Sequence, residues 1–180
     1  NIGSLRFETF LGIPTMALIT TPNNYGNLLI KSVFDYAFAA VALVLSLPFF
    51  IVISITIKIT SKGPVFFRQE RIGLNGRKFM FYKFRTMVAN GEEGQKKLMV
   101  MNEADGPAFK IKKDPRITPV IGTFLRKTGL DELPQLINVL KGEMSIVGPR
   151  PPIPSEVEKY DNWQRRRLSM KPGLTCLWQI

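Results

Sequence analysis

The chain has 180 residues, 45% of them hydrophobic, and its 25 Lys and Arg against 14 Asp and Glu give a formal net charge of +11. This length suits a single domain, and the charge predicts an anionic partner: phospholipid headgroups, a phosphorylated substrate or nucleic acid. The absence of histidine and the single cysteine, Cys176, exclude a disulfide, a zinc site and a His-based triad within this chain. Any chemistry must therefore use carboxylates, Lys, Arg or a hard cation such as Mg²⁺.

Residues 1–27 are predicted to be the tail of an upstream domain followed by a linker. Two short apolar pieces, 11–13 and 16–19, are separated by Pro14 and followed by the turn-like residues 21–26. This segment lacks the basic, apolar and small-residue regions of a signal peptide. We therefore expect the chain to be a piece of a longer protein.

The most apolar stretch, Tyr36 to Ile57, has about 22 residues without a charge, enough to reach across a hydrocarbon core of about 30 Å. Pro48 lies near its middle, where a proline removes one helical hydrogen bond and clashes with the carbonyl four residues earlier. We expect a bend or break there, with the hydroxyl of Ser46 as a local hydrogen-bonding partner. Each arm would then span about half of the core.

Basic residues flank the apolar stretch on both sides. Lys31 precedes it, and six more follow: Lys58, Lys62, Arg68, Arg71, Arg77 and Lys78. Because basic residues favour the cytoplasmic side, we interpret residues 28–62 as a re-entrant helix hairpin with both ends in the cytoplasm. Two alternatives stay open, a Pro-kinked helix that crosses the membrane and a buried core helix of a soluble protein.

Two turn signals after the apolar stretch predict a β-hairpin. Gly63-Pro64 turns the chain, and Asn75-Gly76 has the chemistry of a turn between antiparallel strands. One strand should begin at 65–67, and the second should cover 78–87. We then expect polar residues 89–102 to form a solvated helix without a chemical role.

The second strand combines aromatic and basic side chains, KFMFYKFRTM. Lys83 and Arg85 should fall on the same face as Phe79 and Phe81. Such a strand can bind single-stranded nucleic acid, but a lipid surface explains it together with the neighbouring apolar stretch. We therefore expect no nucleic-acid partner.

Two carboxylates, Asp131 and Glu132, follow Gly129, which ends a short helix predicted to begin at Pro119. They open a second helix, LDELPQLINVLKG, whose apolar residues recur at helical spacing. Acidic residues are favoured in a first helical turn, so a capping role would account for them. A carboxylate pair near many guanidinium groups also suits a site for Mg²⁺ and phosphate. The nearby basic residues are Arg126, Arg150 in the sequence GPRP, Arg165, Arg166, Arg167 and Lys171.

Five segments together resemble the bacterial sugar transferase family, the monotopic polyprenyl-phosphate hexose-1-phosphate transferases. The resemblance covers about residues 28–179 and includes the apolar segment interrupted by proline. The other segments are LIKSVFDY, GPVFFRQERIGLNGRKFMFYKFRTM, DPRITPVIGTFLRKTGLDELPQLINVLKGEMSIVGPRP and KPGLTCLWQ.

The resemblance implies an α+β fold, in which a re-entrant helix-break-helix carries a small, mostly helical catalytic domain with a short β-hairpin. This domain, residues 63–180, would rest on the cytoplasmic face of the bacterial inner membrane. The implied reaction transfers a hexose-1-phosphate from a UDP-hexose to undecaprenyl phosphate and releases UMP. It is the first membrane step of exopolysaccharide, capsule or O-antigen synthesis. Membrane lipids and a second copy of the chain would be further partners.

The resemblance also implies residue roles. Asp131 would be the nucleophile that forms a covalent phosphosugar intermediate, and Glu132 would bind Mg²⁺, for which Mn²⁺ could substitute. Arg126 and Arg150 would contact phosphates. We expect the strand residues Lys83 and Arg85 to bind substrate phosphates as well.

The sequence departs from the family pattern in three places. Leu47 separates Ser46 from Pro48, whereas family members commonly have Ser directly before this Pro, and Cys176 replaces a usual Gly. The chain stops at Ile180 within a motif that ordinarily continues, so we expect the catalytic domain to be incomplete at its C-terminus. The alternative function is a non-catalytic membrane module that binds anionic lipids or partner proteins. Mg²⁺-dependent release of UMP would distinguish the two.

Overall fold

The computed structural model describes residues 4–10, 13–19, 25–88 and 114–176. It separates into two compact units, Asn1–Phe34 and Asp35–Ile180. The first contains an antiparallel pair of strands, β1 (Ser4–Phe10) and β2 (Ile13–Ile19), in which Ser4 pairs with Ile19. The sequence predicted only a domain tail and linker in this region. The helix expected at 89–102 lies outside the described residues.

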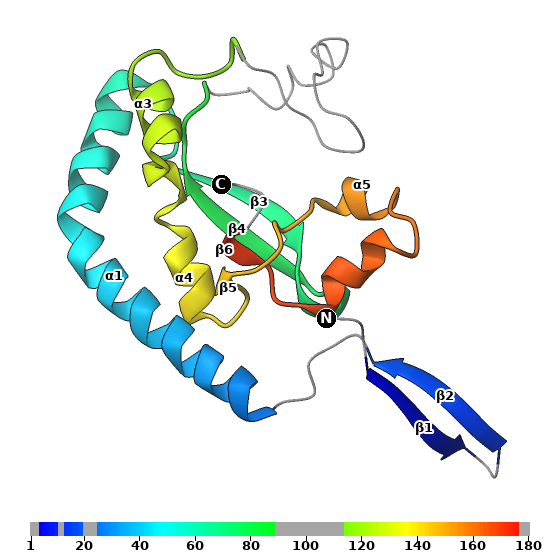
Figure 1. The fold of residues 1–180 in the computed structure, drawn as a ribbon. Helices are drawn as coiled ribbons and strands as arrows, with labels where there is room; N and C mark the ends of the chain where they lie inside the picture. Colours follow the sequence, from blue (N-terminus) through cyan, green and yellow to red (C-terminus); the bar gives the residue numbers. More distant parts are fainter. Residues whose placement is uncertain (1–3, 11–12, 20–24, 89–113, 177–180) are drawn as a thin grey trace. The chain divides into compact units, whose positions relative to one another are not determined.

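Helix α1 runs from Tyr25 to Thr60 without interruption at Pro48. Between Asp35 and its end it follows a curve around α3 and α4 (Figure 1). The hydroxyl of Ser46 donates a hydrogen bond of 3.0 Å to the carbonyl of Leu43, one turn before the proline. Of the expected bend or break at Pro48, the break is absent: the proline is accommodated within one continuous, curved helix rather than between two separate arms (Figure 1). A proline removes a single hydrogen bond, which helical residues on both sides can tolerate when other contacts hold them.

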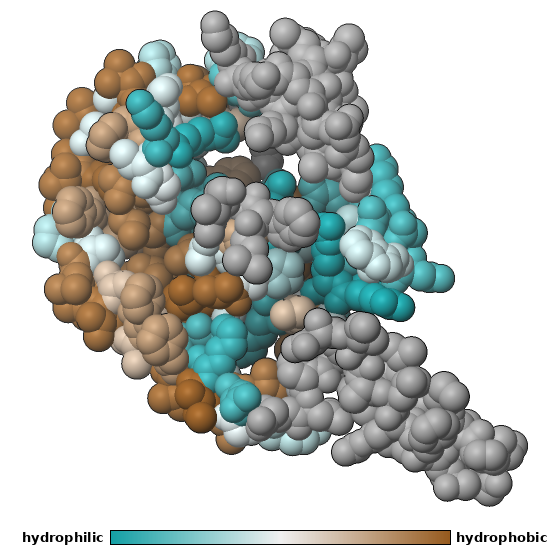
Figure 2. All heavy atoms as spheres, in the orientation of Figure 1, coloured by the Kyte–Doolittle hydropathy of each residue, from teal (hydrophilic) through white to brown (hydrophobic). Residues whose placement is uncertain are grey.

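One face of α1 is apolar and exposed. The helix is long and apolar enough to cross a membrane, and only 17% of its most apolar window is buried. Figure 2 shows hydrophobic residues along most of its length. Exposed large side chains on it include Val41, Val44, Leu45, Phe49, Ile51, Val52 and Ile55. A buried core helix does not fit this exposure, which indicates contact with a membrane.

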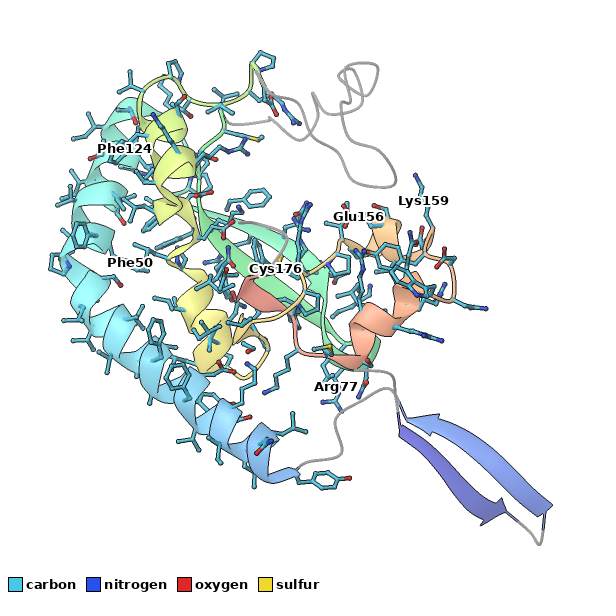
Figure 3. The ribbon with its side chains drawn as sticks, viewed as in Figure 1. Phe50, Arg77, Phe124, Glu156, Lys159 and Cys176 are labelled. Atoms are coloured by element: carbon cyan, nitrogen blue, oxygen red, sulfur yellow. The ribbon has the colours of Figure 1, made fainter. Side chains whose placement is uncertain are left out.

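The opposite face of α1 packs on the rest of the second unit at two levels. Ala39 joins a buried cluster that contains Phe79, Phe81, Leu136, Val139 and Met144. About four and five turns later, Ile53 and Ile57 pack with Phe84 and Leu125. Phe50 also points to this side (Figure 3), with its ring centroid 5.0 Å from that of Phe84.

A polar contact strengthens the attachment of α1 near Ala39. The buried carboxylate of Asp35 accepts hydrogen bonds from the Ser145 hydroxyl, at 2.7 Å, and from the Ile146 backbone N–H, at 3.2 Å. Hydrogen bonds to a buried charged group are stronger than those between neutral groups. Asp35 therefore fixes the orientation of α1 on this unit.

The predicted β-hairpin is confirmed. Strands β3 (Phe66–Ile72) and β4 (Lys78–Phe84) are antiparallel, with Ile72 opposite Lys78. Asn75 and Gly76 have φ values of 54° and 77°, the left-handed conformation that this pair adopts readily in turns. They belong to a short 3₁₀ turn, η1 (Leu74–Gly76).

The remaining elements surround this hairpin. The predicted short helix is α3 (Ile121–Thr128), and Gly129 ends it in a left-handed conformation with φ of 72°. The predicted second helix is divided into a 3₁₀ turn, η3 (Leu130–Glu132), and α4 (Gln135–Leu140), because Pro134 cannot continue the hydrogen-bonding pattern. The other elements are β5 (Ser145–Val147), α5 (Pro154–Val157), η4 (Gln164–Ser169) and β6 (Gly173–Thr175), with β5 and β6 parallel.

Candidate active site

Two carboxylates and a lysine meet where η3 faces strand β4. The turn at Gly129 brings Asp131 and Glu132 back towards the hairpin after α3. The Nζ of Lys83 lies 3.4 Å from Oδ2 of Asp131 and 3.1 Å from Oε1 of Glu132. Asp131 is only 4% exposed, whereas the side chain of Glu132 is partly open to solvent. The structure therefore joins Lys83, predicted to lie on a strand, with the carboxylate pair predicted at a helix start.

Both carboxylates lie in the first turn of η3, where acidic residues are favoured, but this position does not explain their contact with Lys83. The N-cap residues of η3 and α4 are Gly129 and Pro134, and neither has a side-chain capping hydrogen bond. Asp131 and Glu132 instead point to Lys83. A buried carboxylate that does not cap a helix but contacts an ammonium group is typical of a functional site.

Burial raises the pKa of the Asp131 carboxyl above its ordinary value. The positive charge and hydrogen bond of Lys83 act in the opposite direction, as does the charge of Arg126, while the charge of Glu132 raises the pKa further. In the protein itself burial is the largest influence, so additional positive charge would favour the ionised form.

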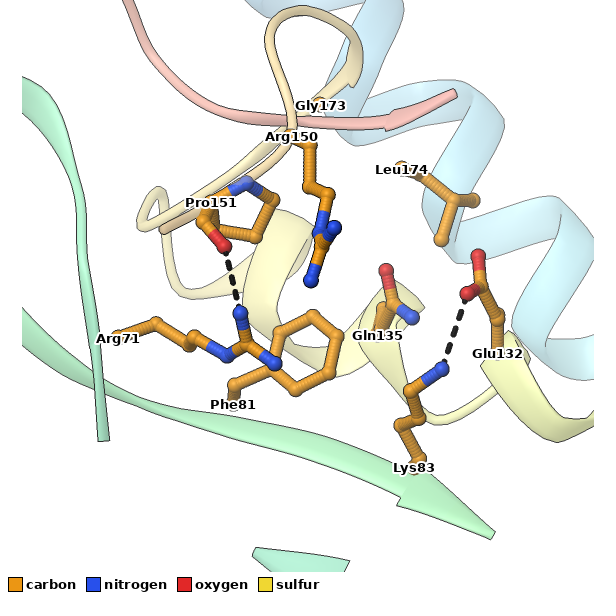
Figure 4. Close-up of a pocket in the computed structure, with 9 residues that line it drawn as sticks. All are labelled: Arg71, Phe81, Lys83, Glu132, Gln135, Arg150, Pro151, Gly173 and Leu174. Carbon is orange, nitrogen blue, oxygen red and sulfur yellow. Dashed lines mark hydrogen bonds and ion pairs between the residues drawn. The ribbon is translucent and has the colours of Figure 1, made fainter. Parts of the chain in front are cut away.

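Glu132 and Lys83 line a pocket of about 250 Å³ (Figure 4). Three of its lining side chains are cationic, Arg71, Lys83 and Arg150, and one is a carboxylate, Glu132. The other lining residues are Phe81, Gln135, Pro151, Gly173 and Leu174. Such an excess of positive charge suits an anion with several negative charges, as in phosphate esters.

Backbone contacts hold the turn that carries Arg150. Gly173 donates a 2.9 Å hydrogen bond to the carbonyl of Pro149, and the backbones of Gly148 and Gly173 approach so closely that neither position has space for a Cβ. At the end of β3, Ile72 N–H donates to the carbonyl of Pro152 at 2.9 Å. The side chain of Arg150 is thereby directed into the pocket (Figure 4).

Arg126 and Arg85 lie outside the pocket lining. Arg126 Nε donates a hydrogen bond of 3.1 Å to the hydroxyl of Thr86, and its charge influences Asp131. Arg85 is buried against the end of α1, where its Nη2 donates to the carbonyl and hydroxyl of Ser61 at 3.0 and 2.6 Å. The structure thus places Arg85 where it stabilises the end of α1, not with Lys83, as the sequence analysis expected.

The donor set fits a hard divalent cation. Mg²⁺ in proteins commonly uses one or two carboxylates together with substrate phosphates and water. Glu132 lines the pocket and Asp131 lies beside it, so both could supply oxygen ligands next to a phosphate. Among the described residues, no group of three or more His, Cys, Asp or Glu side chains is placed to hold a metal ion.

Comparison with known proteins identifies the family. The profile of the family described as bacterial sugar transferase matches residues 26–180. The chain belongs to this family. The resemblance found in the sequence is therefore confirmed.

Several relatives of this bacterial sugar transferase are similar over most of the chain. Galactosyl transferase CpsE of Streptococcus agalactiae is 47% identical over 100% of the chain and 40% of CpsE. Exopolysaccharide production protein ExoY of Rhizobium meliloti is 46% identical over 83% of the chain and 68% of ExoY. The UDP-glucose:undecaprenyl-phosphate glucose-1-phosphate transferase of Klebsiella pneumoniae is 41% identical over 100% of the chain and 37% of that enzyme. The chain thus spans about two fifths of CpsE and of the Klebsiella transferase.

Two polar residues of the pocket, Arg71 and Gln135, were not predicted from the sequence. Arg71 was considered there only as a basic residue that flanks the apolar stretch. The hairpin register places Arg71 opposite Phe79, on the buried face of the hairpin. A basic residue on that face was a usable signal, since the Asn75-Gly76 turn already indicated the pairing.

Proposed function

We propose that the protein containing this chain transfers a hexose-1-phosphate from a UDP-hexose to undecaprenyl phosphate and releases UMP. The observation that carries the proposal is the buried Asp131 carboxylate, in contact with Lys83 and beside a pocket lined by three cationic side chains. The name of the Klebsiella relative states this type of reaction with UDP-glucose. CpsE is named a galactosyl transferase, so the hexose is glucose or galactose in our proposal.

In the first half of the proposed reaction, a carboxylate oxygen of Asp131 attacks the phosphorus bonded to the hexose. A bond forms between that oxygen and phosphorus, the bond to the bridging oxygen breaks, and UMP leaves with the electron pair. Lys83 and Arg150 offset the negative charge of the donor, which would otherwise repel the carboxylate. Mg²⁺ or Mn²⁺, bound through Glu132, would add positive charge beside the attacked phosphorus.

In the second half, an oxygen of undecaprenyl phosphate attacks the same phosphorus and regenerates the Asp131 carboxylate. Lys83 contacts Asp131 directly and therefore stabilises the returning negative charge. Attack by carboxylate requires an ionised Asp131. The raised pKa of this group thus predicts that the rate of the first half increases with pH.

We further propose that both ends of α1 lie on the cytoplasmic side, so that the helix is re-entrant in its membrane topology although it is unbroken. Asp35 and Ile57 are about 33 Å apart along the helix, yet both contact the same unit. A perpendicular crossing would bring this charged unit into the hydrocarbon core, which is costly. The exposed face of α1 enters the bilayer instead, and nucleotide sugars reach the site from the cytoplasm.

The proposed function is tested with the full-length protein in membranes or nanodiscs. Radiolabelled UDP-glucose, UDP-galactose and other UDP-sugars are each supplied with undecaprenyl phosphate and Mg²⁺. We expect one of the two hexoses to be incorporated into lipid with equimolar release of UMP. Failure to release UMP from every donor, by folded protein, would favour the alternative of a non-catalytic lipid-binding module. Light scattering of the same sample tests the self-association that the family resemblance implied.

A further inference from the structure

Arg71 is held at the end of the pocket opposite Glu132 and Lys83 (Figure 4). Figure 4 shows Arg71 and Arg150 at one end, Lys83 and Glu132 at the other, and Gln135 between them. The Nη1 of Arg71 donates a 2.9 Å hydrogen bond to the carbonyl of Pro151. Its guanidinium carbon lies 5.2 Å from the centroid of the Phe81 ring. These contacts fix a charged side chain that reaches the pocket from strand β3.

The two guanidinium groups lack full compensation by acidic side chains. Burial, followed by the neighbouring charge of Arg150, lowers the pKa of Arg71 to about 10, although the charges of Glu156 and Glu132 act in the opposite direction. Oε1 of Glu156 lies 4.0 Å from Nη2 of Arg150, and 53% of the Arg150 side chain is exposed. Two like charges in a partly buried pocket repel each other, and an anion placed between them would remove that cost.

Unused hydrogen-bond donors point to the same ligand. The amide of Gln135 is almost fully buried, at 2% exposed, and its Nε2 has no hydrogen-bond partner within the described part of the chain. The Nε of Arg71 is also buried and also has no hydrogen-bond partner among the described residues. A buried polar group without a partner is destabilising, so such groups in a pocket indicate a ligand with acceptor oxygens.

We propose that Arg71 and Arg150, with the Gln135 amide, bind one phosphate monoester, first the phosphate of departing UMP and then the phosphate of undecaprenyl phosphate. The inference rests on the proposed function and adds Arg71 and Gln135 to the substrate-binding residues. Each monoester carries up to two negative charges, which matches the two guanidinium groups. In each monoester one phosphate oxygen reacts, and it must face Asp131. The oxygen of UMP leaves the phosphorus that becomes bonded to Asp131, and the oxygen of the lipid phosphate later attacks that same phosphorus.

The bonds and charges balance without a further reactant. Cleavage of the bridging bond places the electron pair on a UMP oxygen, and the Arg71–Arg150 pair stabilises the dianion formed there. UMP dissociates, and the lipid phosphate takes the same position. Attack by its oxygen breaks the bond between phosphorus and Asp131, and the carboxylate recovers its electron pair.

The test uses the full-length protein in nanodiscs and separates the two halves of the reaction. Exchange of radiolabelled UMP into UDP-hexose without acceptor gives the KM for UMP, and the complete reaction gives the KM for undecaprenyl phosphate. We expect Arg71→Gln to raise both values by about 10- to 100-fold, the effect of losing a charge-assisted hydrogen bond. Arg68→Gln is the matched control, since Arg68 lies on the same strand but is exposed and outside the pocket.

A double-mutant cycle separates binding by Arg71 from simple support of the Arg150 turn through Pro151. If both guanidinium groups bind phosphate, Arg71→Gln raises the KM for UMP again in an Arg150→Gln background. If Arg71 acts only by positioning Arg150, Arg71→Gln leaves the KM for UMP unchanged in the Arg150→Gln background. That result overturns the proposal. Arg71→Lys provides a charged variant should the Gln variant fail to fold, and we expect a smaller rise for it.

Failure of this inference is distinguishable from failure of the proposed function. A wild-type protein that neither exchanges UMP nor transfers hexose contradicts the proposed function itself. A wild-type protein that exchanges UMP, with a KM for UMP unchanged by Arg71→Gln, contradicts only the role of Arg71. A rise in the KM for UMP without a rise for undecaprenyl phosphate overturns the shared use of one phosphate site.

Discussion

Phe84 should be essential for the attachment of α1 to the catalytic unit. This ring is 1% exposed and contacts Phe50 of α1, at 5.0 Å between centroids, and Phe66 of β3, at 5.4 Å. Truncation of a fully buried Phe to Ala removes its burial and leaves a cavity, which costs about 3–5 kcal/mol. For a unit of this size that cost corresponds to a decrease in Tm of about 6–20 °C.

Thermal unfolding of Phe84→Ala in nanodiscs, followed by circular dichroism, measures this decrease. Met80→Ala is the matched control, because Met80 lies on the same strand and is 42% exposed. We expect the control to change stability by about 0.5 kcal/mol or less. Equal Tm values for the two variants would refute the argument that α1 packs on the unit at this level, and with it the structural support for the proposed topology.

Three further predictions concern the site and the membrane. Because burial raises the pKa of Asp131 in the folded state, folded protein retains this proton more tightly, and stability falls as pH rises from the ordinary carboxyl pKa to the raised one. Asp131→Asn should therefore raise Tm at pH 7 while it abolishes turnover, and a lower Tm at pH 7 would show that the charge stabilises the fold. Chelation by EDTA should stop UMP release, and Glu132→Gln should raise the Mg²⁺ concentration needed for activity; full activity in EDTA contradicts the metal proposal. In a Cys176→Ser background, cysteines at Lys31 and Lys62 should both resist an impermeant thiol reagent in intact cells, whereas labelling of only one would mean that α1 crosses the membrane.

Local sequence chemistry was sufficient for much of the fold. The Asn75-Gly76 pair predicted the turn and therefore the register of β3 and β4. Gly129 correctly marked the end of α3, where its left-handed conformation was required. Each of these features depends on a few neighbouring residues, so a single sequence can reveal it.

Features that depend on distant contacts were not predicted. The parallel pairing of β5 with β6 joins residues far apart in the sequence and has no local signal. Pro48 predicted a bend or a break, whereas α1 is one continuous curved helix that packs on the second unit at two levels. Arg85 was assigned to the phosphate site because the strand alternation was extended past Phe84, where β4 ends. Its guanidinium occupies the space beside Gly63, which has no side chain to exclude it.

In the candidate site, too, local features were predicted from the sequence and contacts between distant residues were not. Asp131 and Glu132 stood out because two carboxylates followed a helix-ending glycine, and Arg150 because it lay in a rigid proline turn. The contact between Lys83 and Asp131 could not be predicted, because it joins residues 48 positions apart in the sequence that only the fold brings together. Gln135 carried no sequence signal, since its importance comes from burial without a hydrogen-bond partner among the described residues.

The central proposal, attack by Asp131, is tested most directly by trapping the intermediate. Wild-type protein is incubated with UDP-hexose labelled in the hexose, with Mg²⁺ and without undecaprenyl phosphate, then quenched and digested for mass spectrometry. We expect one hexose-phosphate per active site on the peptide that contains Asp131, UMP released in equal amount, and loss of the label when undecaprenyl phosphate is added. Absence of any adduct, together with an active Asp131→Asn variant, would contradict the proposed mechanism.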